Sequence, residues 1–160
     1  MKRVAIALGV ALALGVPPTA GAQARPDFSG TWKLNAAKSG AVTGNTPNIA
    51  FPSQLEVKQS ATEFYVAGTS VRQAPVTATY KLDGSTVPVN APRGITETAA
   101  AKFEGINVVI TARRSFTSPA GETVINFKEV WTVTGNVLTI EKTRIESGES
   151  ASEKAVYDKA

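Results

Sequence analysis

Apolar and polar residues alternate along most of the chain after residue 50, and turn residues separate the alternating segments. Alternation with a period of two places successive side chains on opposite faces, which is typical of half-buried β-strands. The pattern predicts nine strands, at 28–34, 53–59, 63–71, 75–82, 94–103, 106–116, 122–134, 136–146 and 152–158. The separators include Asp-Gly, Glu-Gly and Gly-Asn pairs, so tight hairpins are expected between neighbouring strands.

The chain shows no segment with the 3.6-residue period of a long helix. Residues 36–50 form one long connection, rich in small and polar residues, in which a short helical turn has room to form. Consecutive short strands joined by hairpins make an antiparallel meander, which protects its edges best by closing on itself. We therefore expect an all-β fold, a single antiparallel up-and-down β-barrel of about 8–10 strands.

The first 24 residues have the pattern of a secretory signal peptide. Two basic residues, an apolar run at 4–16 and the small-x-small sequence Ala22-Gln23-Ala24 follow one another. Such a run is too short to span a membrane, and no cysteine follows the cleavage site. We expect a signal peptide at 1–24, a barrel domain at 25–160 and a periplasmic or secreted protein that is not membrane-embedded.

Composition narrows the chemistry. The sequence contains no cysteine and no histidine, which excludes disulfides, Ser-His-Asp and Cys-His catalysis and the common zinc sites. Without Lys2 and Arg3 the 17 basic residues become 15, against 13 acidic ones, so the mature chain has a formal charge of +2. That near-neutral balance argues against a nucleic-acid partner. We expect no metal, no cofactor and a monomer.

The expected barrel opens with Phe28-Ser29-Gly30-Thr31-Trp32-Lys33-Leu34. A glycine at the start of a strand suits a tight crossing at a barrel end, and the indole two residues later would plug that end. The alternative is an ordinary core tryptophan on a strand of a β-sandwich.

This segment resembles the Gly-x-Trp first strand of the calycins, which include lipocalins and intracellular fatty-acid-binding proteins. The ending Val156-Tyr157-Asp158-Lys159 is similar to the last strand of the fatty-acid-binding branch, and Trp32-Lys33-Leu34-Asn35 with Lys38-Ser39 resembles the start of exported bacterial lipocalin-like proteins. The resemblance implies a barrel that binds a small hydrophobic or amphipathic molecule. It also implies that Gly30, Trp32 and Tyr157 help to close the barrel.

The chain departs from this family in three places. The fatty-acid-binding branch holds a carboxylate with an Arg-x-Tyr pair in its last strand, but here Ala155 precedes Tyr157 by two residues. Residues 35–52 show no counterpart of that branch's helix-turn-helix lid, and the Thr-Asp-Tyr signature of lipocalins is absent. Recognition of a fatty acid therefore does not carry over with the resemblance.

Hairpin registers predict which side chains meet across the sheet. A two-residue turn at Glu104-Gly105 would place Glu97 opposite Ala112, and one at Gly135-Asn136 would place Glu129 opposite Lys142. For the loop at 117–124, the parity of the strands allows Ile110 opposite Trp131 and Ala112 opposite Glu129.

Four charged residues then share the apolar face, on four successive strands with alternating sign: Glu97, Arg114, Glu129 and Lys142. Arg144 continues the set toward one barrel end. Charges on an apolar face need partners, because desolvation is costly. They either line the polar part of a cavity, with Arg114 best suited to a carboxylate or phosphate headgroup, or neutralise one another near the strand ends and reach solvent.

The inward parities also carry aromatic residues, namely Phe64, Tyr80, Phe103, Phe127 and Trp131. Core packing is the default for such residues in a small barrel. The small run Ala99-Ala100-Ala101 would leave volume for a cavity on an inner face, unless a nearby large side chain fills it. The candidate ligand-binding residues are Arg114, Glu97, Glu129, Lys142, Trp131, Phe127 and Tyr80.

Two functions remain open from the sequence. One is a binding protein whose cavity mouth is bordered by 35–52 and by 83–93, a connection that contains Pro88 and Pro92. The other is a protein-interaction or inhibitor module with a packed barrel and working loops, for which Ile49, Phe51 and Pro52 are the candidates. A Glu97–Glu129 acid–base pair is the sole basis for an enzyme. A membrane barrel is disfavoured because the outward parities are polar.

Overall fold

The computed structural model describes residues 24–43, 51–70 and 73–160. Eleven strands and one 3-10 turn are assigned within these ranges: β1 (Gly30–Leu34), η1 (Ala36–Lys38), β2 (Gly40–Thr43), β3 (Gln54–Gln59), β4 (Glu63–Ser70), β5 (Gln73–Lys81), β6 (Asp83–Pro88), β7 (Ile95–Glu104), β8 (Asn107–Ser118), β9 (Gly121–Thr134), β10 (Val137–Glu146) and β11 (Glu149–Lys159).

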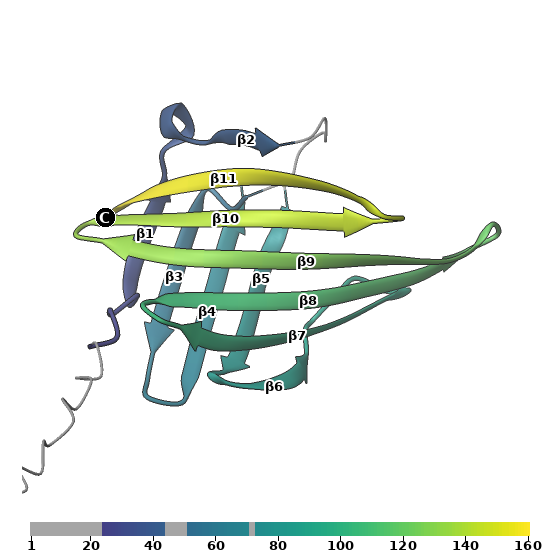
Figure 1. Cartoon of the computed structure of the whole chain (residues 1–160), viewed down its shortest axis with the longest axis horizontal. Coiled ribbons are helices and arrows are strands. Elements are labelled where there is room, and N and C mark those ends of the chain that lie inside the picture. The colour runs from purple at the N-terminus through teal and green to yellow at the C-terminus, as the bar shows by residue number, and fades with distance from the viewer. Residues whose placement is uncertain (1–23, 44–50, 71–72) are drawn as a thin grey trace, which may run out of the picture.

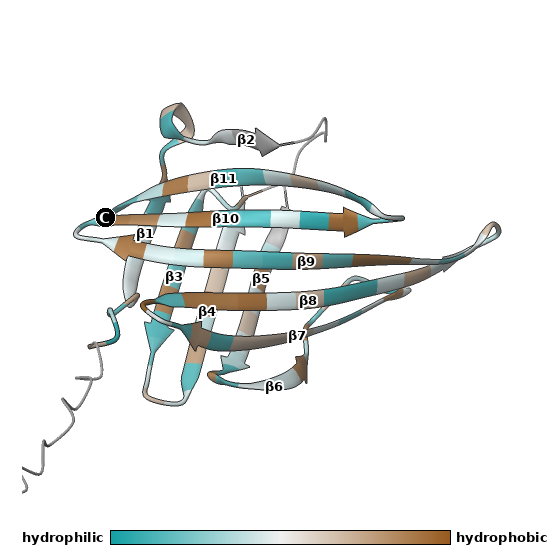
Figure 2. Ribbon diagram, viewed as in Figure 1, coloured by the Kyte–Doolittle hydropathy of each residue, from teal (hydrophilic) through white to brown (hydrophobic). Residues whose placement is uncertain are grey.

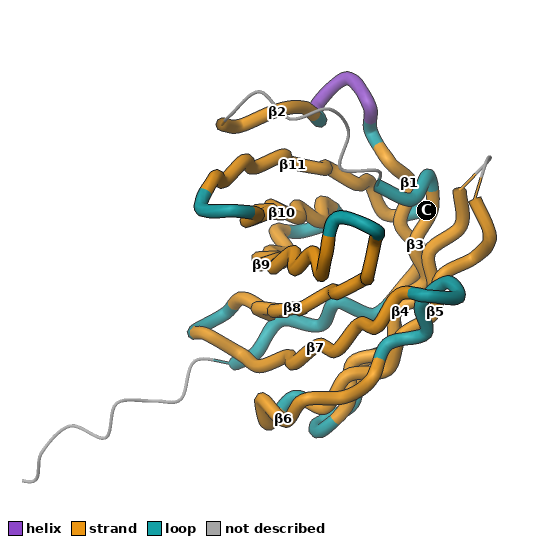
Figure 3. The backbone as a smooth tube through the Cα atoms, turned by 90° about the vertical axis from the view of Figure 1, so that its right-hand side faces the viewer, coloured by secondary structure: helices purple, strands orange, loops and turns teal. Residues whose placement is uncertain are grey.

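Ten of these strands follow one hydrogen-bonded path, in the order β5-β4-β3-β1-β11-β10-β9-β8-β7-β6, and β2 pairs separately with β11. The paired neighbours are antiparallel. Strands β7 to β11 form one wall, and β1, β3, β4 and β5 cross behind them as the other (Figures 1 and 3). The expected all-β up-and-down barrel is confirmed.

The barrel is nearly closed. Strands β1 and β11 join its two walls, with Trp32 opposite Lys159. The hydrogen-bonded path ends at β5 and β6, so these two strands bring unpaired edges to the remaining gap. Contacts of β5 with β6 and β7 hold that side together. The Leu82 N–H donates to the Thr62 carbonyl and so extends the β4–β5 ladder by one residue.

All nine predicted strands are present, and two further strands were missed. Strand β6 is a mostly exposed edge strand without apolar alternation, so it was interpreted as a connection. Strand β2 is four residues long and lies in the 36–50 connection. The short helical turn expected there is η1, where the Asn35 side chain accepts a hydrogen bond from the Lys38 N–H.

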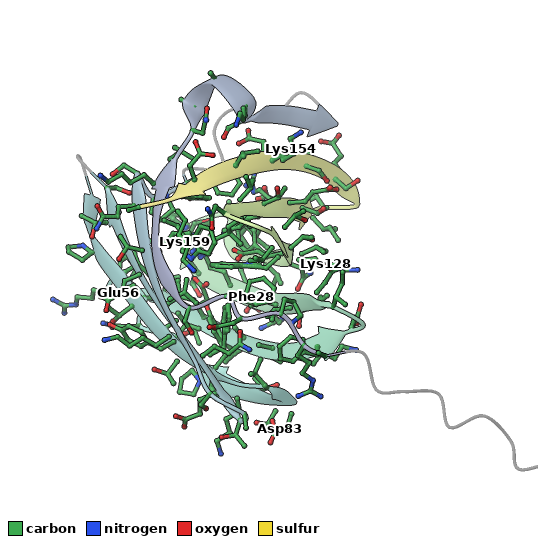
Figure 4. The ribbon with its side chains drawn as sticks, turned by 90° about the vertical axis from the view of Figure 1, so that its left-hand side faces the viewer. Phe28, Glu56, Asp83, Lys128, Lys154 and Lys159 are labelled. Carbon is green, nitrogen blue, oxygen red and sulfur yellow. The ribbon has the colours of Figure 1, made fainter. Side chains whose placement is uncertain are left out.

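Aromatic rings fill one end of the barrel, which we call the base. Phe28 and Trp32 are fully buried, and the Trp32 Nε1–H donates to the Phe28 carbonyl at 3.0 Å. The Phe28 ring meets Phe64 edge-on at 5.8 Å between centroids, and Phe64 meets Trp131 in the same way at 5.4 Å. Figure 4 shows Phe28 between the two walls, in the segment that leads into β1. The Trp32 indole therefore lies buried in the base, beside the segment that leads into β1 and the end of the last strand.

Gly30 lies where the last strand crosses the first. Its φ of +141° is unfavourable for residues with a side chain, and a Cβ here would lie 2.8 Å from the Lys159 Cε. The Lys159 Nζ lies 5.2 Å from the Trp32 ring centroid, as a cation–π contact. The positive φ, which glycine adopts readily, thus suits the packing of the first strand against the last one at the base.

Replacing Phe28 with alanine tests the importance of the base. Phe28→Ala should lower the free energy of unfolding by about 3–5 kcal/mol, because it removes a fully buried ring from an aromatic cluster. Urea denaturation of the 25–160 chain measures this value. Ile106→Ala, at a side chain 38% exposed in a turn, is the control and should change the free energy by less than about 1 kcal/mol. Equal effects would show that the segment before β1 does not complete the core.

Candidate ligand-binding site

A cavity of about 560 Å³ lies between the two walls, beyond the aromatic base. Such a volume is within the usual range of small-molecule sites. Its apolar lining comes from both walls of the barrel and includes Leu55, Val66, Ala78, Ile125 and Ile140. Val76 of β5 also lines it and is 53% exposed, so the cavity reaches solvent near this strand.

All seven candidate residues line this one cavity: Tyr80, Glu97, Arg114, Phe127, Glu129, Trp131 and Lys142. Arg144 lines it as well. Figure 2 shows part of the basis in the sequence, because an apolar stretch of β8, at the end beside the C-terminus, is followed by polar residues farther along the strand. The inward face of this strand is thus apolar at the base and charged toward the open half.

Two of the expected hairpin registers were wrong by two residues. The β7–β8 turn is centred on Gly105 and Ile106, so Glu97 lies opposite Arg114 and not opposite Ala112. The β8–β9 turn is centred on Pro119 and Ala120, which places Ile110 opposite Glu129. The Gly135-Asn136 turn is confirmed, with Glu129 opposite Lys142 and Trp131 opposite Ile140.

Glu97 and Arg114 form an ion pair across β7 and β8. The Arg114 Nε and Nη2 atoms each lie 2.7 Å from the same Glu97 oxygen, Oε2. The Glu97 side chain is only 14% exposed, whereas Arg114 is 37% exposed. The carboxylate is therefore the more enclosed partner, and its charge is balanced where it lies.

Glu129 and Lys142 form a second ion pair, across β9 and β10. The Lys142 Nζ lies 2.7 Å from the Glu129 Oε1, and the Trp131 Nε1–H donates to Oε2 at 2.9 Å. Burial alone would raise the pKa of Glu129. The charge and hydrogen bond of Lys142 and the hydrogen bond of Trp131 outweigh burial and hold that pKa below its ordinary value. Glu129 is therefore ionised at neutral pH.

The Phe127 ring lies between the cations of these two pairs. The Arg114 guanidinium carbon is 5.2 Å and the Lys142 Nζ 4.9 Å from its centroid. Arg144 lies opposite Phe127 in the ladder and pairs with Glu146. We call Glu97, Arg114, Phe127, Glu129 and Lys142 the charged belt. It crosses four adjacent strands on one wall of the cavity.

Two tyrosines complete the polar surface. Burial first, and then the negative charges of Glu129 and Glu97, raise the pKa of Tyr80 well above its ordinary value, so the phenol stays neutral. Burial likewise raises the pKa of Tyr157, whose hydroxyl donates to the Pro52 carbonyl at 3.0 Å. Tyr157, expected only in barrel closure, thus also lines the cavity and anchors the chain just before β3.

Other expectations about the cavity need correction. Ala99 and Ala101 face inward, but they are packed in the core and do not line the cavity. Ile106 is exposed in the turn between β7 and β8. Phe51 and Pro52, proposed as working loop residues, line the cavity instead, and Ile49 lies outside the described residues.

The expected mouth agrees in part with the structure. Phe51 and Pro52, at the end of the 35–52 connection, line the cavity. Val89 of the 83–93 connection lines it as well. The Gly68 residue on β4 leaves room for Pro52, since a Cβ there would lie 2.7 Å from the proline Cγ. This close approach was not predicted, because a lone glycine in a strand does not identify its neighbour.

Within the described ranges, no group of three or more acidic, histidine or cysteine residues is arranged to hold a metal ion. The same part of the chain contains no helix long and apolar enough to cross a membrane. Glu97 and Glu129, the carboxylates considered for an acid–base pair, each contact a cation.

The sequence matches no protein-family model and no curated protein. Solved structures do resemble the chain. Zebrafish ileal bile acid-binding protein, solved with cholic acid, has a TM-score of 0.54 at 14% identity, over 83% of this chain and 98% of that chain.

Two further structures cover 83% of this chain and 95% of their own. A secretory abundant heat soluble protein of Ramazzottius varieornatus has a TM-score of 0.52 at 10% identity, and lipid binding protein 8 of Caenorhabditis elegans has a TM-score of 0.50 at 12% identity. At these identities the likeness shows the fold alone. The fold is a calycin-like barrel.

The paired state of Glu129 predicts a specific pH dependence of stability. Because its pKa is lowered on folding, its stabilising contribution is complete above the ordinary carboxyl pKa and is lost as the pH falls through the lowered value. Glu129→Gln should cost about 1–3 kcal/mol at pH 7, because the Lys142 ammonium loses its partner. The difference from the native chain should shrink below about pH 4.

Urea denaturation between pH 7 and pH 3 measures this difference. Glu56→Gln is the matched control, since Glu56 pairs with Lys58 on the exposed outer face. Its effect should stay within about 0.5 kcal/mol. A difference for Glu129→Gln that stays constant as the pH falls would contradict the ionised, paired state.

Proposed function

We propose that this chain is an exported binding protein that carries or sequesters a small hydrophobic or amphipathic molecule in its barrel cavity. One observation carries the proposal, namely a cavity of about 560 Å³ whose lining is divided between apolar side chains and the charged belt. A long apolar group would lie against residues such as Leu55 and Val66. Its polar end would lie against Arg114, Lys142 and their partners, where desolvation is least costly.

The similar structures support the proposal without deciding it. Their names include a bile acid-binding protein and a lipid binding protein, so this barrel accommodates amphipathic molecules elsewhere. The same barrel also occurs in a heat soluble protein whose name specifies no ligand. Because one fold serves many functions, the argument rests on this chain's own cavity.

Export is supported by the sequence pattern of residues 1–24, and the proposed location is the periplasm or the extracellular space. The barrel makes use of the residues directly after that segment. The Arg25 guanidinium lies 4.5 Å from the Phe103 ring centroid, and Phe28 is buried in the base. Cleavage after Ala24 would therefore leave every residue that the base needs.

The alternative of a packed interaction module is less well supported. It requires a filled interior and an apolar loop surface, whereas the structure has a cavity, and Phe51 and Pro52 face it. The enzyme alternative required a free carboxylate pair, but each carboxylate has its own cation.

Filling the cavity tests the proposal. Ala78 lines the cavity from β5, so Ala78→Trp would occupy ligand volume. Native mass spectrometry of chain purified from a periplasmic preparation should show an extra mass that organic extraction removes. The extracted chain should also bind a hydrophobic fluorescent dye. Ala78→Trp should lower dye affinity by about tenfold or more, since it removes the space for an apolar group.

Thr79→Trp is the matched control, because Thr79 is the next residue on the same strand and faces outward, exposed to solvent. It should leave dye binding unchanged. A native chain that carries no extra mass and takes up no dye would overturn the proposal. Equal loss of binding in both tryptophan variants would show that the dye binds elsewhere.

A further inference from the structure

We propose that the ligand's polar end carries no net charge, so that the cavity selects an uncharged or zwitterionic amphiphile over a simple fatty carboxylate. This inference rests on the proposed function and specifies its ligand class. It follows from how the charges of the cavity wall are arranged, and it differs from the sequence-based alternative in which Arg114 holds a carboxylate or phosphate headgroup.

The charges at the cavity are already balanced. Five charged residues line it, namely Glu97, Arg114, Glu129, Lys142 and Arg144. Glu97 neutralises Arg114, Glu129 neutralises Lys142, and Arg144 pairs with Glu146. In the described residues, no buried side-chain nitrogen or oxygen lacks a hydrogen-bond partner. With Glu146 counted as the partner of Arg144, the charges at the cavity wall thus sum to zero.

A monoanionic headgroup would disturb this balance. Two Arg114 nitrogens are already engaged by Glu97, and the Lys142 ammonium is engaged by Glu129. A bound carboxylate would either add a negative charge beside Glu97 and Glu129 or displace one of them from its cation. A carboxylate left unpaired at a site only 14–20% exposed is costly. A monocationic headgroup would likewise either add a positive charge beside Arg114 and Lys142 or displace one of them from its carboxylate.

A net-neutral headgroup avoids this cost and still finds hydrogen bonds. Beyond the contacts within the ion pairs, the Glu97 Oε1 atom can still accept a hydrogen bond from a headgroup. Arg114 Nη1 and the remaining Lys142 N–H groups can donate hydrogen bonds to it. The neutral Tyr80 hydroxyl lines the same cavity near both carboxylates. Donors and acceptors thus alternate along the charged belt. Hydroxyl groups of a glycerol, or the two charges of a phosphocholine, match such a surface.

Four lauryl-chain amphiphiles test the inference, because they differ only in the polar end. They are monolaurin (uncharged), lauryl phosphocholine (zwitterionic), laurate (anionic) and laurylamine (cationic). Isothermal titration below the aggregation limit of each compound gives the four dissociation constants. At least one of the two net-neutral amphiphiles should bind tenfold or more tightly than laurate and laurylamine.

Removing one charge should change the preference in a defined direction. Glu97→Gln leaves the Arg114 guanidinium without its counter-charge, and a charge-assisted hydrogen bond to laurate then becomes available. The ratio of laurate to monolaurin affinity should rise about tenfold or more. Arg114→Gln is the reciprocal variant, and it should raise the ratio of laurylamine to monolaurin affinity in the same way. Either variant serves if the other fails to fold.

Glu56→Gln is the control, since it removes a carboxylate from an exposed ion pair on the outer face and should leave all ratios unchanged (Figure 4). Laurate binding to the native chain as tightly as the net-neutral compounds would overturn the inference while the proposed function stands. Unchanged ratios in both charge variants would overturn it as well. Binding of none of the four compounds, nor of the hydrophobic dye, would overturn both proposals.

Discussion

A charged side chain can lie on the inner face of a barrel only where its counter-charge lies beside it. The registers of β7–β8 and β9–β10 meet this condition, because they place Glu97 directly opposite Arg114 and Glu129 directly opposite Lys142. Each pair then tolerates partial burial that an isolated charge would not. The cavity lies in the half of the barrel that these pairs occupy, beyond the aromatic packing of the base.

The interior therefore has two parts with different roles. At the base, Phe28, Trp32 and Phe64 exclude solvent and join the first strand to the last, with Gly30 allowing the close crossing. Beyond it, the charged belt faces apolar side chains of the opposite wall across the cavity. An amphipathic molecule has the same division along its length. The comparison with solved structures supports only the barrel fold. The argument for a ligand comes from the chemistry of the cavity wall.

The sequence predicted which side chains face inward, but it did not predict the register of every pair of strands. Period-two alternation assigned all seven candidate residues to the inner face, and a register error of two residues leaves a side chain on the same face. The β7–β8 error arose because Gly105, with a φ of +62°, takes the first central position of its turn and not the second. Sequence alone allows either position. The place of Pro52 at the cavity depends on Tyr157, which is 105 residues away in the sequence, and on Gly68 of the neighbouring strand β4. Neither contact has a local sequence pattern.

The two tryptophans of the chain provide the most direct test that the cavity is the binding site. The Trp131 indole N–H bonds Glu129 at the cavity wall, whereas the Trp32 indole N–H bonds the Phe28 carbonyl in the closed base. Monolaurin and laurate should each be titrated into ¹⁵N-labelled protein while both indole resonances are followed. The account predicts a saturable shift of the Trp131 resonance and an unmoved Trp32 resonance with whichever compound binds. Binding that leaves Trp131 unmoved, or that shifts Trp32 alone, would contradict it.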